Sequence, residues 1–483
     1  MCQGLIASTR PTLPTRGLPR GRFGDRISSP RAAAAVPGGS SRRTPIRRVA
    51  VRQSAGHRAR ARAASSATPA CPDRQVTAPL RAARARENTR GQVPDRPAVV
   101  RRDAGRRAEG GGRVDLGARA IAFYLPQYHP VPENDAWWGP GFTEWTNTVR
   151  GRPLFPGHRQ PHLPADLGFY DLRVPEVRAA QAELARAHGV AAFAYWHYWF
   201  GGGRRLLERP FAEVLASGEP TLPFCLAWAN ETWTGTWHGA PDRVLAEQTY
   251  PEGDDRDHLT ALLPAFRDER YLRVGDRPVL VVHKPGELPD ARAFVDRWQA
   301  LARAAGLPGL YLVAEVSDWF DWGEGFPGAE AAGFDAGIQM RLPVRFGRRE
   351  FWRRRLGRRV GRGPEHYPVD PAFLARRPLP PTRQPCVMPN WDNTPRSGRQ
   401  GIAMTGTSPD VFRRHVADAT ALLADRPEQE RLLWVKSWNE WAEGNYLEPD
   451  AEHGTAWLEA LRDGLQVPAA RVPAGRAADP APA

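Results

Sequence analysis

Residues 432–444 read Leu-Leu-Trp-Val-Lys-Ser-Trp-Asn-Glu-Trp-Ala-Glu-Gly, an apolar run of strand length that leads into two acidic side chains among tryptophans. The acids are Glu440 and Glu443. Side chains three residues apart on a helical turn have Cβ atoms about 5–6 Å apart. Two carboxyl groups held this close push their pKa values apart, so one donates a proton while the other stays ionised. The stretch therefore predicts a pair of catalytic carboxylates, although isolated acids of this spacing are also typical of an ordinary helix start.

The rest of the chain indicates which fold carries this stretch. Apolar runs of strand length recur eight times, at residues 120–125, 190–195, 224–228, 278–282, 310–314, 336–338, 386–388 and 432–435. Helical patterns lie at 174–188, 290–305, 409–423 and 455–465, and Gly189 and Gly306 occupy expected helix ends. Alternating strands and helices indicate a parallel sheet. Eight units predict an α/β fold of the (β/α)8 TIM barrel type with loop insertions, and a doubly wound open sheet is the alternative.

The formal net charge of +15 is distributed unevenly. Residues 1–116 hold 25 arginines and 7 acidic residues, whereas the remainder holds 43 basic and 46 acidic residues. The first segment lacks Trp and sustained periodicity, so we expect 1–116 to be a disordered Arg/Ala/Pro-rich tail. The barrel domain is expected at 117–468, and a disordered C-terminal tail at 469–483. The basic tail has no recognisable binding module and is equally consistent with a wrongly assigned start codon, so we expect no specific nucleic-acid partner.

No apolar run reaches about 18 residues and no secretory signal is visible, which predicts a cytoplasmic protein. A second basic element at 345–360 leaves membrane association open. Its simpler interpretation is a solvated Arg-rich helix, and the alternative is an interfacial helix in peripheral contact with anionic membrane.

Metal and cofactor chemistry is not indicated. Cys2 and Cys71 lie in the tail and Cys225 and Cys386 in apolar runs, which is neither a disulfide framework nor a zinc spacing. The histidines also lack a recognisable ligand spacing, so we expect no metal and no cofactor.

Polar and aromatic side chains follow each predicted strand. In a TIM barrel these positions converge at the C-terminal mouth, where active sites lie. Sugars stack their C–H faces on indole rings while amides, imidazoles and carboxylates bond their hydroxyls. The candidate substrate-binding residues are Gln127, Tyr128, His129, Trp145, His197, Tyr198, Trp199, Asn230, Glu231, Trp233, His283, Lys284, Asn390, Trp391, Asp392, Trp438, Asn439 and Trp441. Three strand tryptophans, Trp196, Trp228 and Trp434, are expected to be core instead.

Five segments, 124–130, 137–147, 193–199, 227–233 and 437–450, together resemble the WbsX-like bacterial proteins. That group is linked to surface-polysaccharide biosynthesis and is similar to glycoside hydrolase family 99. The resemblance implies a (β/α)8 barrel and endo-acting cleavage of α-mannosidic links with retention. In family 99 a Glu-Trp-His-Glu-Gly motif supplies both carboxylates. By position Glu440 would be the base that draws a proton from the 2-hydroxyl, giving a 1,2-anhydro sugar, and Glu443 would be the acid. Ala442 departs from the motif, because family 99 has His there.

The sequence thus predicts a carbohydrate-active enzyme that cleaves or transfers glycosyl units of a mannan-like or surface polysaccharide. Its expected partner is an oligosaccharide or polysaccharide substrate. Close carboxylates favour retention, because retaining glycosidases hold them about 5–5.5 Å apart. Two alternatives remain open. One is a nucleotide-sugar-dependent glycosyltransferase in O-antigen or capsule biosynthesis, although no Asp-x-Asp motif or nucleotide cradle is visible. The other is a non-catalytic glycan-binding barrel.

Overall fold

The computed structural model describes residues 116–235, 240–317, 328–345, 363–375 and 379–466 of the 483-residue chain. The expected tails, except Leu116, and the basic element from residue 346 onward lie outside the described residues.

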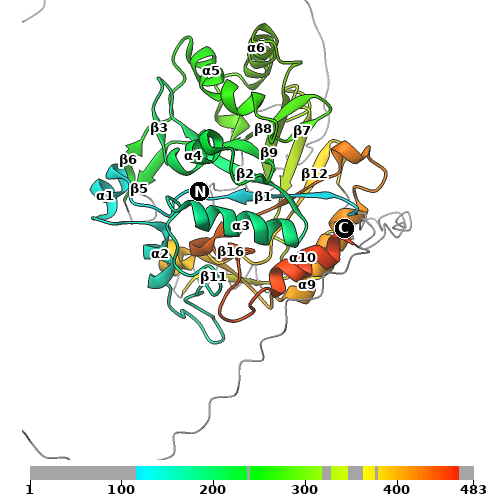
Figure 1. The fold of residues 1–483 in the computed structure, drawn as a ribbon. Coiled ribbons are helices and arrows are strands. Elements are labelled where there is room, and N and C mark those ends of the chain that lie inside the picture. The colour runs from blue at the N-terminus through cyan, green and yellow to red at the C-terminus, as the bar shows by residue number, and fades with distance from the viewer. Residues whose placement is uncertain (1–115, 236–239, 318–327, 346–362, 376–378, 467–483) are drawn as a thin grey trace, which may run out of the picture. The chain divides into compact units, whose positions relative to one another are not determined.

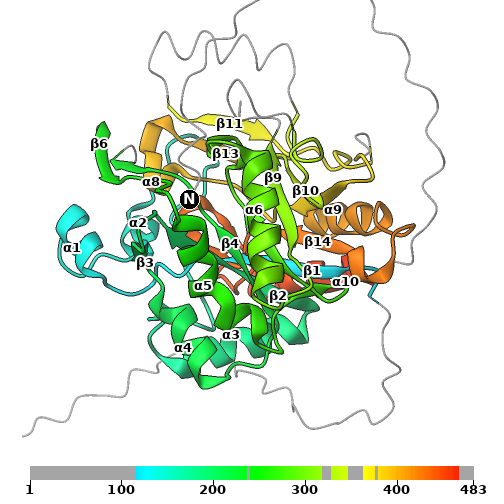
Figure 2. The ribbon, with the colours of Figure 1, turned by 90° about the horizontal axis from the view of Figure 1, so that it is seen from above.

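Eight parallel strands form a closed barrel (Figures 1 and 2). They are β1 (Arg119–Tyr124), β2 (Val190–Trp199), β4 (Phe224–Trp228), β8 (Arg277–Val282), β9 (Tyr311–Ser317), β10 (Ala336–Met340), β12 (Arg383–Val387) and β14 (Leu432–Val435). Neighbours follow the order β1-β14-β12-β10-β9-β8-β4-β2, and β2 pairs back onto β1. That last pairing, for example Tyr124 opposite Tyr195, closes the sheet. The predicted TIM barrel is confirmed, and the open sheet is excluded.

The eight apolar runs all became barrel strands, and the helical patterns were also placed correctly. The predicted helices are α3 (Pro175–Ala187), α6 (Ala291–Ala304), α9 (Pro409–Ala421) and α10 (Ala456–Leu465). The side chain of Asp290 caps α6 by accepting a hydrogen bond from Ala293 N at 2.9 Å. Gly189 and Gly306 have φ values of 82° and 83°, the left-handed conformation expected after a helix end.

Further elements lie in the connections. The remaining helices are α1 (Pro132–Trp138), α2 (Glu144–Arg150), α4 (Arg209–Ser217), α5 (Asp254–Arg267) and α8 (Thr394–Ser397). Short strands are β3 (Arg205–Leu206), β5 (Trp233–Gly235), β6 (Ala240–Ala246), β7 (Arg273–Val274), β11 (Glu365–Pro368), β13 (Ile402–Thr405), β15 (Asn439–Glu440) and β16 (Asn445–Tyr446). Single 3-10 turns are η3 (Pro285–Glu287), η4 (Gly398–Gln400), η5 (Glu428–Glu430) and η6 (Trp441–Glu443).

Aromatic rings pack inside the barrel and between its outer face and α6. Phe123 stacks between Trp196 and Trp434, with ring centroids 4.9 and 5.5 Å away. Trp228 packs against Phe294 and Trp298 of α6. The three tryptophans expected in the core are all buried. Large buried rings contribute much of the apolar area that stabilises a core, so this layer supports the loops above it.

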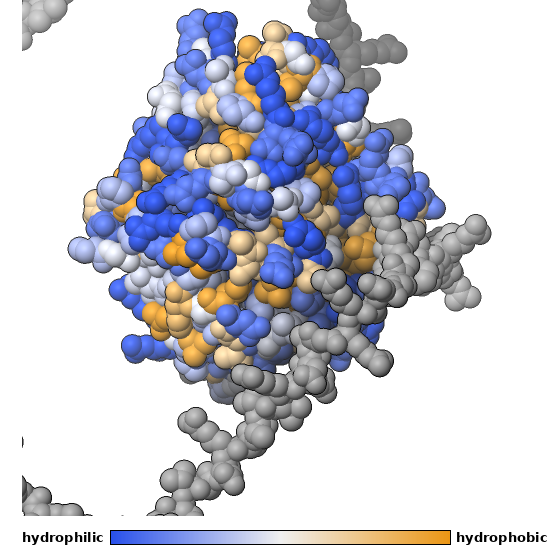
Figure 3. Space-filling model, in the orientation of Figure 1, coloured by the Kyte–Doolittle hydropathy of each residue, from blue (hydrophilic) through white to orange (hydrophobic). Residues whose placement is uncertain are grey.

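The surface carries mostly hydrophilic side chains on the face in Figure 3, with apolar residues in small separated groups. No helix in the described ranges is both long enough and apolar enough to span a bilayer.

Candidate active site

The stretch that follows β14 folds back on itself at the C-terminal mouth of the barrel. Glu440 ends β15 and pairs with Asn445 in the antiparallel strand β16, while Glu443 ends the 3-10 turn between them. Ser437 Oγ accepts a hydrogen bond from Glu440 N at 3.0 Å and donates to Asn445 O at 2.8 Å. The two acids therefore lie on a small hairpin, not on one α-helical turn as the spacing alone suggested.

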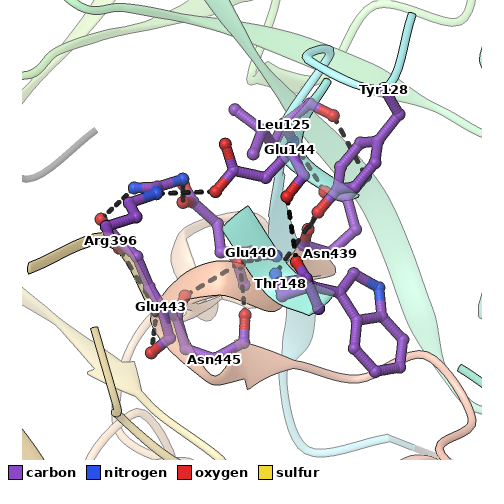
Figure 4. Close-up of polar contacts among 11 residues, drawn as sticks. Leu125, Tyr128, Glu144, Thr148, Arg396, Asn439, Glu440, Glu443 and Asn445 are labelled. Atoms are coloured by element: carbon purple, nitrogen blue, oxygen red, sulfur yellow. Dashed lines mark hydrogen bonds and ion pairs between the residues drawn. The ribbon is translucent and has the colours of Figure 1, made fainter. Parts of the chain in front are cut away.

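Arg396 of α8 joins the two acids to a third carboxylate, Glu144 at the start of α2 (Figure 4). Its Nε atom lies 2.7 Å from Glu144 Oε1, one terminal nitrogen lies 3.3 Å from Glu440 Oε2, and the other bonds Glu443 Oε1. All four side chains are buried. Because one guanidinium reaches Glu440 and Glu443 at once, the two carboxylates lie close together.

The carboxyl groups around Arg396 differ in pKa. Burial works to raise the pKa of Glu443, but Arg396 and weaker contributions from other groups, Lys436 among them, together outweigh it and lower the pKa to about 2. Burial raises the pKa of Glu144 despite its contact with the same guanidinium. Glu440 Oε1 is buried and has no hydrogen-bond partner in the described part of the chain. Three carboxylates around one arginine leave an excess of negative charge, which favours a proton within the cluster.

Two predicted residues secure the hairpin to the end of β1. Asn439 Oδ1 accepts from Leu125 N at 2.7 Å, and its Nδ2 donates to Leu125 O at 3.0 Å. The Tyr128 hydroxyl donates to Asn439 O and accepts from Trp441 N at 3.3 Å. These groups hold the backbone beside Glu440, as Figure 4 shows for Asn439 and Tyr128.

Asp392 secures the other end of the hairpin. Its backbone N donates to Glu443 O at 2.7 Å, and its carboxylate accepts from His158 and Gln160, both at 2.6 Å. Gly444 has φ 67°, and a Cβ there would lie 2.9 Å from Asp392 N. Only glycine fits this turn without strain.

Glu448 lies beneath the hairpin in a network that the sequence reading missed. It accepts hydrogen bonds from Trp441 Nε1 at 2.7 Å, Gln181 Nε2 at 2.6 Å and the Tyr170 hydroxyl at 2.8 Å. Burial raises the pKa of Glu448 to about 7, although these donors work in the opposite direction. The network fixes Trp441, which also stacks on Tyr446 with ring centroids 3.9 Å apart.

Predicted residues from the strand ends β4 and β8 pair with one another. Asn230 Nδ2 donates to Lys284 O at 2.7 Å and its Oδ1 accepts from Lys284 N at 2.8 Å, while Glu231 lies 2.8 Å from Lys284 Nζ. His283 contacts Glu315 of β9, with Nδ1 and Oε2 2.6 Å apart. The ends of β4, β8 and β9 thus carry a second set of ionisable side chains, Glu231 with Lys284 and His283 with Glu315.

The expected mouth position is wrong for His197 and Trp199. The Nε2 atoms of His197 and His258 of α5 lie 2.8 Å apart, and Trp199 stacks on His258 and donates to Asp254. Successive side chains of a strand point to opposite faces, and this alternation sends these two outward to α5. Burial brings the pKa of His197 to about 3.

The same alternation sends Tyr198 inward, where its ring contacts Trp233 edge-on at 4.9 Å. Burial, and after it the charge of Glu440, raises the pKa of Tyr198.

The other predicted side chains differ in how deeply they are buried. Trp145, Trp391, Trp438 and Trp441 are packed in the core as supports of the site and are 8% exposed at most, so we do not expect them to be open stacking platforms. Gln127 and Asn390 are half-buried, and Asn390 accepts from the Thr407 hydroxyl at 3.1 Å.

His129 lines a cavity of about 330 Å³ with 205–209 after β2, and a second cavity of about 510 Å³ lies between the start of α5 and α6. Neither cavity is lined by Glu440 or Glu443. Within the described ranges, no group of three His, Cys, Asp or Glu side chains is arranged to hold a metal ion.

Three site residues escaped the sequence reading for different reasons. Glu144 follows no strand and is recognisable only as part of the 137–147 resemblance. Arg396 lies in a chain rich in arginine, so nothing in the sequence distinguishes it. Glu448 lies within the 437–450 segment, but two of its three donors, Tyr170 and Gln181, are more than 260 residues away, so the sequence does not show the network.

Comparison with known sequences identifies the relatives of this chain. Residues 120–461 match the family described as Glycosyltransferase WbsX, which is more than half of the chain. The chain belongs to the WbsX family. Two proteins named uncharacterized protein WxcX, from two strains of Xanthomonas campestris pv. campestris, are each 42% identical over 367 residues. The match covers 72% of this chain and 50% of each relative, so the chain spans about half the length of the curated relatives it matches.

Solved structures with similar folds are more distant. A glycoside hydrolase-like protein covers 74% of the chain and 96% of its own, with 14% identity and a TM-score of 0.46. A GH99 endo-alpha-mannosidase from Bacteroides thetaiotaomicron covers 72% of this chain and 96% of its own, with 13% identity and a TM-score of 0.42.

Proposed function

We propose that this WbsX family member cleaves or transfers glycosyl units of a mannan-like or surface polysaccharide with retention, through Glu440 and Glu443. The observation that carries the proposal is the contact of both carboxylates with the single guanidinium of Arg396. A short separation between two carboxylates is typical of retaining glycosidases. The position at the C-terminal mouth of a closed barrel supports the same function.

The contacts of Glu440 and Glu443 with Arg396 indicate which of the two acts as the base and which as the acid. Arg396 holds Glu443 as a carboxylate, whereas Glu440 makes only the 3.3 Å contact and keeps Oε1 without a hydrogen bond in the described residues. A general acid must carry a proton before the reaction, and a tight ion pair with arginine disfavours the protonated form of a carboxyl group. The geometry therefore favours Glu443 as the ionised base and Glu440 as the acid, which is opposite to the roles that the family 99 resemblance implies.

The activity itself is tested with the full-length chain and a panel of α-linked mannan and heteropolysaccharide fragments. NMR should show products of retained anomeric configuration from the wild type, and none from Glu440→Gln or Glu443→Gln. Products of inverted configuration would refute retention, and equal turnover by all three proteins would refute the two-glutamate site.

The roles are separated by leaving-group dependence. Loss of a general acid slows poor leaving groups most, because activated aryl glycosides need little protonation. With Glu440 as acid, Glu440→Gln should retain activity on 2,4-dinitrophenyl glycosides and lose it on oligosaccharides. The reverse pattern, with selective rescue in Glu443→Gln, would restore the assignment of the resemblance.

Nucleotide-sugar-dependent transfer is the second candidate, and the description of the family as glycosyltransferases favours it. It predicts that nucleotide sugars raise the melting temperature of the full-length chain and that glycan transfer requires them. Cleavage of fragments without any nucleotide sugar would exclude this dependence.

A further inference from the structure

A buried histidine–glutamate pair lies across the barrel from Glu440 and Glu443. His283 follows β8, Glu315 belongs to β9, and their side chains are 2% and 0% exposed. His283 Nδ1 lies 2.6 Å from Glu315 Oε2. We call these two residues the dyad.

The order of the strands places the dyad opposite Glu440 and Glu443 in the barrel. Between β14, which leads into Glu440, and β8, which leads into His283, there are four steps in either direction around the closed sheet. In an eight-stranded barrel this places the two strands opposite each other. A sugar unit at the centre of the mouth would therefore have the carboxylate pair on one side and the dyad on the other.

The dyad is only half satisfied by the protein. The contact with a carboxylate places the imidazole proton on Nδ1, which leaves Nε2 as a hydrogen-bond acceptor. His283 Nε2 and Glu315 Oε1 are both buried and have no hydrogen-bond partner in the described residues. A histidine that serves only the core normally has both nitrogens bonded, because an unpartnered buried polar atom is costly.

The buried ring of Trp196 lies near both the dyad and the segment that carries the carboxylate pair. The Trp196 ring contacts His283 edge-on at 5.2 Å, and Lys436 Nζ lies 5.3 Å from the same ring. Lys436 follows β14 and contributes to lowering the pKa of Glu443. The buried Trp196 ring thus lies near groups from both sides of the barrel, His283 on one side and Lys436 on the other.

We propose that Glu315 orients His283 so that Nε2 accepts a hydrogen bond from a hydroxyl of the sugar unit bound opposite Glu440 and Glu443. The ligand class is a glycan with a free hydroxyl at that position. The inference rests on the proposed function in taking a glycan as substrate, and it holds for hydrolysis and for transfer alike. His283 is then a binding residue and Glu315 a positioning residue.

The first test observes the imidazole directly. Histidine in the full-length Glu440→Gln variant is labelled with nitrogen-15, since this variant should bind glycans without consuming them, and short α-linked manno-oligosaccharides are added. His283 should be in the Nδ1–H tautomer, and its Nε2 resonance should shift on ligand addition. The Nε2–H tautomer, or no shift with any saccharide of the panel, overturns the inference.

The second test measures affinity and turnover. His283→Gln should weaken saccharide binding by about tenfold, the effect of losing one hydrogen bond in a buried site. His188→Gln is the matched control, because His188 lies at the end of α3 and bonds Leu184 O. Glu315→Gln should raise KM more than it lowers kcat and should change the tautomer of His283. Unchanged binding by a folded His283→Gln variant overturns the inference.

Failure of the inference and failure of the proposed function give different results. Saccharide binding that shifts His283 without any cleavage or transfer by the wild type refutes the function and leaves the dyad in place. Products of retained anomeric configuration, together with His283 resonances that do not shift on ligand addition, would support the proposed function and refute the role of the dyad. If the dyad variants do not fold, the resonances of the labelled Glu440→Gln protein still decide.

A deoxy series supplies a further readout with no protein variant. Removing the hydroxyl that His283 binds should weaken affinity for the wild type but not for His283→Gln. Equal losses in both proteins for every deoxy saccharide would contradict the proposed contact.

Discussion

Arg396 Nε lies 2.7 Å from Glu144 Oε1, a buried contact that joins α8, after the seventh barrel strand, to α2, after the first. Both side chains are at most 4% exposed. The same guanidinium serves Glu440 and Glu443, so this cross-connection sets the charge of the candidate site and also holds two long loops together.

Loss of the arginine should therefore be costly. Arg396→Gln leaves three buried carboxylates without their cation, and breaking a buried ion pair costs about 3–5 kcal/mol. Urea unfolding near neutral pH should show this loss, and it should shrink in mild acid as the carboxylates protonate. Arg173→Gln, which breaks the exposed pair with Asp171, is the control and should cost less than about 1 kcal/mol. Equal costs for the two variants would contradict the assigned role of Arg396.

Glu443 should contribute a specific acid limb to stability. Its pKa is lowered from 4.5 to about 2, so the stabilisation is complete above the unfolded value and is lost as pH falls from 4.5 toward 2. The unfolding free energy of Glu443→Gln should lack this part of the pH dependence. Glu459→Gln, an exposed site on α10, should retain it. A wild-type acid limb in Glu443→Gln would mean that another carboxylate is responsible.

Glu448 should act with the opposite sign. Its pKa is raised from 4.5 to about 7, so the folded state is favoured below the unfolded value and loses that advantage as pH rises to about 7. Relative to Glu448→Gln, the wild type should become less stable between pH 4.5 and 7. Parallel curves for the two proteins across this window would show that Glu448 is ionised throughout.

Gly444 should tolerate no side chain. Gly444→Ala combines a positive φ with a Cβ only 2.9 Å from Asp392 N, so the turn that carries Glu443 must shift. We expect a loss of stability of more than about 2 kcal/mol and a fall in glycan turnover of at least about tenfold. Gly218→Ala has φ 75° but nothing within 4 Å, so it isolates the backbone strain and should leave turnover unchanged. Equal behaviour of the two variants would rule out the close approach.

The sequence predicted those features that a single continuous segment of the chain encodes. The eight barrel strands were visible because each is a continuous apolar run bounded by polar residues. Asn439 and Tyr128 could be named because they follow strand ends, and strand ends converge in a barrel. Their actual contacts, which brace the backbone of the hairpin, were not apparent from the pattern.

The prediction failed where direction mattered. His197 and Trp199 lie in the same strand, β2, as Tyr198, and only the alternation of side chains along β2 decides that Tyr198 faces the mouth while the other two face α5. The long apolar run of that strand hides the alternation, since both of its faces are buried.

The sequence by itself determined the barrel, because apolar periodicity is a local property of the chain, and its short motif singled out Glu440 and Glu443 as the predicted catalytic pair. Only the tertiary structure decided that Arg396 stands between those carboxylates and Glu144, and that Glu315 holds His283. Such contacts join side chains from different strand–loop units, and the charge of a buried site depends on neighbours that chain order does not specify.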